Sequence, residues 1–132
     1  MNRFHSFVFV FAALLPSFAA SASDTKLDRS GVVKIVSAIP EVKAWTKHIE
    51  KKTSGKSRVV LRPSETPNLK EGKEYWSVAF FEDNGSYYHL WQSFLVSLDG
   101  GTVLIEGADP SESPLSLEEW RKTKKPLKGI TE

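Results

Sequence analysis

The side chains best suited to chemistry or recognition concentrate in one stretch, residues 82 to 96, EDNGSYYHLWQSFLV. Within it, Tyr87, Tyr88, His89 and Trp91 fall inside five consecutive positions. Imidazole is a common general base, whereas tyrosine and tryptophan rings are enriched at the centres of protein interfaces. The stretch therefore favours either catalysis through His89 or recognition of a partner through the rings.

Catalysis finds little support elsewhere in the chain. Nucleophilic catalysis requires a base held against a serine, threonine or cysteine. The chain has no cysteine, and beyond its N-terminal segment the histidines are His48 and His89. The serine of NGSYY lacks the strand-turn-helix context of a nucleophile elbow. We therefore interpret His89 as a structural or binding residue and predict that the protein is not an enzyme.

A metal or cofactor site is not indicated by the spacing of possible ligands. The two histidines are far apart, and there is no His-x-His or cysteine pair. Four carboxylates lie near the ends of expected strands without the pattern of a calcium loop: Glu82, Asp83, Glu106 and Asp109. We expect neither a metal nor a cofactor.

The N-terminus has the features of a secretory signal peptide. Arg3 precedes an unbroken apolar run over residues 7–15, and Ala20-Ser21-Ala22 offers small residues for cleavage. The run is shorter than the roughly 20 residues that span a bilayer. We predict cleavage after Ala22, export to the periplasm or the exterior, and no membrane span.

Residues 23–132 are predicted to form a single domain, because about 110 residues support one modest core. The absence of cysteine means that packing, and no disulfide, must stabilise it. Removing Arg3 from the 18 basic side chains leaves 17 against 16 acidic ones. A chain so close to neutral is not expected to bind nucleic acid.

The first half of this domain has helical periodicity. Apolar residues recur every three or four positions between residues 24 and 53, which predicts one buried helix face. Asp28 or Ser30 could cap its start. Pro40 predicts either a kink or two consecutive helices, and in the second case Ser37 would cap the second helix.

The second half changes to the alternation of strands. Asn84-Gly85 is a strong hairpin signal, a polar loop is expected over residues 64–73, and Ser116 with Glu119 forms a capping box for a short C-terminal helix. The expected strands are residues 58–63, 74–82, 86–98 and 102–107. The predicted fold is α+β, with the N-terminal helix packed on a four-stranded antiparallel sheet.

Alternation along the two central strands divides their side chains between two faces. We expect Tyr88, Leu90 and Phe94 to meet the helix, at Val36, Ile39 and Trp45. The opposite face would then carry an aromatic surface for binding, made of Tyr75, Phe81, Tyr87, His89 and Trp91. The alternative is that the C-terminal helix covers this surface with Leu117 and Trp120.

Residues 27–108 resemble the PepSY-like domains of exported bacterial proteins, which share the cystatin-like shape. The resemblance rests on the helix VVKIVSAIPEVKAW, the strand EYWSVAFF and the closing hairpin FLVSLDGGTVL, in which Asp99 and Gly101 fit the family pattern with a shorter turn. It implies a helix wrapped by antiparallel strands and a non-catalytic role in binding or in restraining peptidases. QSFLV, residues 92–96, lacks the glycine of the cystatin inhibitory loop, so no active-site residue is transferred.

Three classes of function remain open. The first is an exported binding module of the cell envelope, whose partner is a protein or an extended peptide. The second is an immunity protein that neutralises a toxin in the periplasm, which would have the same size and signal. The third, a small hydrolase, has no constellation of residues to support it.

Overall fold

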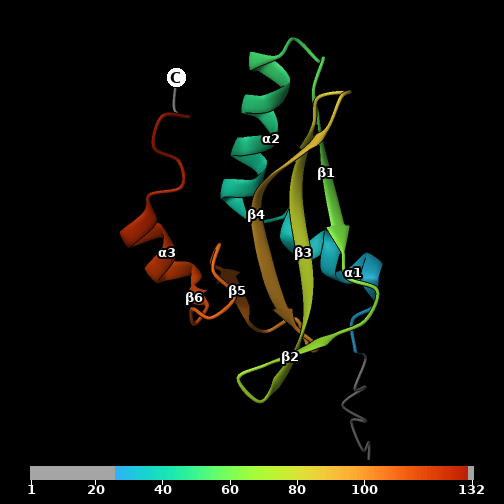
Figure 1. Ribbon diagram of the computed structural model, residues 1–132, viewed down its shortest axis with the longest axis vertical. Coiled ribbons are helices and arrows are strands. Elements are labelled where there is room, and N and C mark those ends of the chain that lie inside the picture. The colour runs from blue at the N-terminus through green and yellow to red at the C-terminus, as the bar shows by residue number, and fades with distance from the viewer. Residues whose placement is uncertain (1–25, 131–132) are drawn as a thin grey trace, which may run out of the picture.

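The computed structural model describes residues 26–130, which form three helices and a six-stranded antiparallel sheet (Figure 1). The predicted α+β class is confirmed. The predicted signal peptide, residues 1–22, lies outside the described residues. The elements in chain order are α1 (Arg29–Ser37), α2 (Pro40–Lys52), β1 (Arg58–Pro63), β2 (Asn68–Lys70), β3 (Lys73–Asp83), β4 (Tyr88–Ser97), β5 (Val103–Glu106), β6 (Leu115–Ser116) and α3 (Leu117–Lys124).

The helical stretch is divided into α1 and α2, the second of the two predicted alternatives. Pro40 is the first residue of α2, where its missing N–H costs no helical hydrogen bond. Asp28 caps α1 through a 2.7 Å bond from Gly31 N to Oδ1. The predicted cap of α2 by Ser37 is wrong, because Ile39 occupies that position and forms no side-chain cap.

The sheet has the strand order β1-β3-β4-β5-β6, and β2 pairs with β3 beyond the end of β1. The predicted count of four strands missed the short β2 and β6, which contain three and two residues. β2 lies inside the expected loop 64–73 and returns to β3 through Glu71 and Gly72, both at positive φ (51° and 80°). A tight hairpin turn therefore replaces part of the predicted loop.

The hairpin at Asn84-Gly85 exists as predicted, but its loop is longer than a two-residue turn. The last paired residues are Asp83 and Tyr88, so β4 begins at Tyr88. Asn84 Oδ1 accepts hydrogen bonds from the backbone N–H groups of Ser86 and Tyr87, each 3.0 Å long. This asparagine cap fixes the loop over residues 84–87, which we call the hairpin tip.

α1 and α2 lie behind the sheet in the view of Figure 1, and the main core fills the space between these two layers. Trp45 of α2 contacts Phe80 of β3 edge to face at 5.4 Å between ring centroids. Its indole N–H donates to the carbonyl oxygen of Pro126 at 3.0 Å, so burial leaves no polar atom unpaired. Within residues 26–130, no helix has the length and apolar character needed to cross a membrane.

α3 extends the helix layer. Ser116 caps it through a 3.1 Å bond from Glu119 N, as predicted. Trp120 contacts Trp45 and Phe94 edge to face at 5.7 and 6.0 Å, on the side of the sheet that α1 and α2 cover. The alternative in which Leu117 and Trp120 cover the opposite side is therefore ruled out for Trp120. We call that opposite side the outer face.

The lower end of the sheet, drawn at the bottom of Figure 1, holds the start of the described chain. Leu27 N donates to the Leu98 carbonyl at 2.9 Å, and the Trp76 indole donates to the Leu27 carbonyl at 3.1 Å. Gly100 completes this end with φ +76°, and a Cβ there would lie 2.8 Å from Leu27 and 2.9 Å from Ile35. Only glycine fits this close approach.

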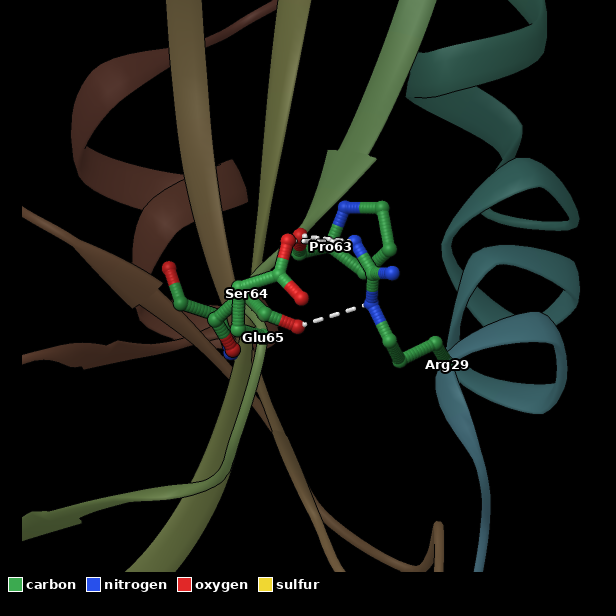
Figure 2. Close-up of polar contacts among 5 residues, drawn as sticks. Arg29, Pro63, Ser64 and Glu65 are labelled. Carbon is green, nitrogen blue, oxygen red and sulfur yellow. Dashed lines mark hydrogen bonds and ion pairs between the residues drawn. The ribbon is translucent and has the colours of Figure 1, made fainter.

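Arg29, the first residue of α1, fastens this helix to the chain that follows β1 (Figure 2). Its guanidinium donates to the carbonyl oxygens of Ser64 and Pro63 at 3.1 and 3.3 Å, and it lies 3.3 Å from a Glu65 carboxylate oxygen. One side chain therefore satisfies two carbonyls where the strand ends. This contact helps to hold the lower end of β1 against α1.

Candidate binding site

A β-bulge divides the central hairpin into two halves. Phe80 pairs with Gln92, but the next residue of β3, Phe81, pairs with Leu90. Trp91 is therefore the extra residue on β4. A shift of one residue exchanges the two faces of a strand, so the side chains before Trp91 point opposite to the strict alternation assumed from the sequence.

The bulge turns Trp91 toward the helices. Its ring centroid lies 5.6 Å from that of Trp45 and 6.0 Å from that of Phe80. The indole N–H donates to Glu82 Oε2 at 3.1 Å. The prediction that Trp91 lies on the outer face is wrong, because the extra residue in β4 brings it to the edge of the core.

The same bulge brings Tyr88 and Leu90 to the outer face, although we predicted that they would contact the helix. Tyr88 meets Phe81 edge to face at 6.0 Å. The guanidinium of Arg62, on β1, lies 5.3 Å from the Phe81 ring and 5.1 Å from the Tyr88 ring. We call this group of four, Arg62, Phe81, Tyr88 and Leu90, the hairpin patch.

The hairpin patch is accessible to a partner. Tyr88 and Leu90 each keep 49% of their surface exposed, and Tyr87 at the adjoining tip keeps 63%. Of the predicted binding residues, only Phe81 belongs to the patch, and Tyr87 flanks it. Sequence alternation placed Tyr88 and Leu90 on the wrong face because it does not reveal the bulge, and Arg62, on β1, was not considered.

His89 lies apart from the patch. It pairs with Glu82 across the hairpin, and alternation from Tyr88 and Leu90 places it on the opposite side of the sheet. Its side chain is exposed to solvent. Across residues 26–130, no group of three or more His, Cys, Asp or Glu side chains could hold a metal ion.

Tyr75 is on the outer face, but at the lower end and only 7% exposed. There the turn after β2 meets the loop between β5 and β6. Lys70 Nζ donates to the Pro110 carbonyl at 2.9 Å, and Ser113 Oγ donates to Glu71 Oε1 at 2.6 Å. These contacts join the two segments at the lower end, and Tyr75, being buried, is not available for binding.

An ion pair secures the hairpin beside the patch. Arg58 Nε lies 3.0 Å from Asp83 Oδ2, and the two residues face each other across β1 and β3. The pKa of Asp83 is lowered, first by the hydrogen bond from Gly85 N–H and then by the Arg58 guanidinium. The charged form of Asp83 thus stabilises the start of the tip.

Comparison of the chain with protein-family models, with curated proteins and with solved structures found no match. The PepSY-like resemblance therefore stays a prediction. Evidence on function therefore comes from the hairpin patch and its surroundings.

A cavity of about 650 Å³ opens where β5 stops beside β4. β4 supplies Leu90, Trp91 and Ser93, and α3 supplies Trp120 and Lys124. The loop after β5 contributes Gly107 and Glu112. Gln92 closes one side, because its amide donates to the Glu106 carbonyl at 2.7 Å. Leu90 thus belongs to both the hairpin patch and the rim of this cavity.

Proposed function

We propose that the protein is an exported binding module of the cell envelope that holds another protein through the hairpin patch. The observation that carries this proposal is that exposed apolar side chains cluster at one end of the sheet. Among the described residues, the large hydrophobic side chains that are exposed are Leu69, Tyr87, Tyr88 and Leu90. Three of them surround the hairpin tip and patch, whereas Leu69 stands alone on β2.

The patch has the physical properties of a recognition surface. Aromatic and arginine side chains are enriched among the residues that dominate binding energy. Arg62 is held over two rings, which limits the rotamers it must give up when a partner arrives. The rings stand on paired strands, so their positions are set before binding.

The predicted signal peptide supports an envelope location, and the PepSY-like resemblance supports a role in restraining a peptidase or another envelope enzyme. An immunity protein would use the same surface and differ in its partner. Binding thus accounts for the patch without any catalytic group.

The test is capture of partners from an envelope extract by immobilised protein, with mass spectrometry of what is retained. We expect Tyr88→Ser with Leu90→Ser to reduce capture at least about tenfold, since interface residues of this kind often contribute more than about 2 kcal/mol. Leu69→Ser is the control, because it removes an even more exposed leucine (73%, against 49% for Leu90) from β2, away from the patch.

The thermal midpoint of each variant is measured in parallel, and we expect it to stay near that of the wild type. Equal capture by the wild type and the double variant would refute the proposal. If capture depends on the patch, a retained peptidase assigns restraint and a retained toxin assigns immunity.

A further inference from the structure

We propose that the partner docks as an extended segment that pairs with the free edge of β4 and carries alternating apolar and basic side chains. This inference rests on the proposed function, because the edge borders the hairpin patch at Leu90. It goes further by naming the form and the chemistry of the partner.

The edge is defined by the difference in length between two strands. β3 pairs with β4 along its length, from Ser97 to Tyr88, whereas β5 pairs with it only from Val96 to Ser93. Within the described chain, residues 88–92 have no strand on the β5 side. Backbone N–H and C=O groups along such an edge can pair with an added strand.

Gln92 marks the boundary between the occupied and free parts of this edge. Its side-chain amide donates to the carbonyl oxygens of Glu106 and Ser93, at 2.7 and 3.0 Å. It thereby acts as a hydrogen-bond donor to the last carbonyl of β5, which could otherwise pair with a further strand residue. A segment that pairs with β4 must lie beyond this point, toward the hairpin tip.

The cavity beside the edge can receive side chains from an added strand. Side chains on the helix side of that strand would point toward Trp91 and Trp120, which line the cavity with Ile105. Trp91 reaches this position only because of the bulge. The surroundings on this side are mainly apolar, so they favour apolar residues at alternate positions.

The opposite side of an added strand would meet carboxylates. Glu106 pairs with Ser93 on the outer face, and Glu112 lies so close to Gly107 that a Cβ there would be 2.9 Å from its Oε2. Neither carboxylate forms an ion pair within residues 26–130. Lys124 of α3 is the single cationic side chain that lines the cavity. Two carboxylates against one ammonium favour a basic segment.

A titration followed by ¹⁵N–¹H correlation spectra tests the proposal. The probes are a short blocked peptide of alternating valine and lysine, and a counterpart of valine and glutamate. We expect the lysine peptide to shift the amide signals of residues 88–93 and 106–107. We expect the glutamate peptide to bind at least about tenfold more weakly.

N-methylation distinguishes strand pairing from simple charge attraction. Alternate residues of a strand direct their N–H groups to the same edge. Methylating all valine nitrogens therefore blocks one edge of the peptide, and methylating all lysine nitrogens blocks the other. We expect one methylated peptide to lose at least about tenfold in affinity and the other to retain most of its binding.

Charge reversal tests the recognition of basic side chains. We expect Glu106→Lys with Glu112→Lys to make the protein prefer the glutamate peptide. Glu74→Lys with Glu118→Lys is the control, since it makes the same change in net charge at exposed positions outside the cavity lining. We expect this control to keep the original preference.

Three outcomes would overturn the proposal: no shifts along β4, equal binding of both methylated peptides, or concentration-dependent self-association through residues 88–92. The last outcome would assign the edge to a second copy of the chain. The double variant at Tyr88 and Leu90 can lose its envelope partner while the peptides cause no shifts along β4. That result would support the proposed binding function and contradict the addition of a strand.

Discussion

Tyr75 and Tyr88 occupy the same face of the same sheet, yet one is 7% exposed and the other 49%. At the lower end, two hydrogen bonds join the turn after β2 to the loop after β5, and β2 pairs with β3 at Tyr75. At the hairpin end, β5 has already stopped and the outer face stays open. Accessibility on this sheet thus depends on the surroundings at each end of the strands, since the residue type is the same at both ends.

The two ends also differ in how they use tryptophan. At the lower end, Trp76 follows strict alternation and donates to the Leu27 carbonyl. At the hairpin end, Trp91 reaches the helix layer through a bulge and leaves the outer face to Tyr88. The tryptophan at the lower end therefore fastens the start of the described chain to the sheet. The tryptophan at the hairpin end extends the core and leaves the outer face exposed.

The largest expected effect comes from truncating the covered tyrosine. Tyr75→Ala should lower the free energy of unfolding by about 2 to 4 kcal/mol, because it leaves a cavity where a large buried ring was removed. Tyr88→Ala is the matched change at the open end and should stay within about 0.5 kcal/mol of the wild type. Urea denaturation measures both. Similar losses for the two variants would break the comparison between the ends.

Truncation of the half-buried tryptophan should have an intermediate effect. We expect Trp91→Ala to cost about 1 to 2 kcal/mol, because the ring contacts Trp45 and Phe80 without full burial. Trp91→Phe should recover most of that loss, since it keeps an aromatic ring against Trp45 and Phe80 and loses the second ring with the bond to Glu82. An unchanged denaturation midpoint in Trp91→Ala would show that the bulge does not connect this residue to the core.

The smallest effect concerns the turns at the two ends, where the pKa values of Asp83 and Asp99 are both lowered. The main cause at Asp83 is the N–H of Gly85, and at Asp99 it is the Ser97 hydroxyl. A lowered pKa stabilises the fold above the usual carboxyl pKa near 4, and this contribution disappears as the pH falls through the lower native value.

Asp83→Asn and Asp99→Asn should therefore reduce Tm slightly at neutral pH, with the difference from the wild type shrinking toward about pH 2. Thermal scans by circular dichroism across this pH range measure the change. If the difference in Tm stays constant with pH, the aspartates stabilise their turns through side-chain shape and not through charge.

Much of the fold could be predicted because local signals agreed with one another. The apolar stripe, Pro40 and Asp28 located α1 and α2, and Ser116 located the start of α3. The β2 hairpin was missed because its turn places Glu71 at positive φ, a conformation that glutamate rarely adopts and that no propensity indicates. Only Gly72 signalled it.

The candidate site was harder to predict because one inserted residue changes the direction of every side chain on one side of it. Strict alternation placed Trp91 outside and placed Tyr88 and Leu90 inside. The lower end is also joined by contacts such as that of Lys70 with Pro110, 40 residues apart, which a local pattern cannot reveal.

The hydrogen bond between Leu27 and Leu98 determines which end of the sheet lies next to the N-terminal side of the domain. This contact holds the chain at the lower end, and the 11 residues of β3 lead from there to the hairpin tip. At about 3.3 Å per residue, the strand separates the two ends by roughly 35 Å. A protein tethered to a bead or a surface through its N-terminal side would therefore hold the hairpin patch away from the support, where a large partner can reach it.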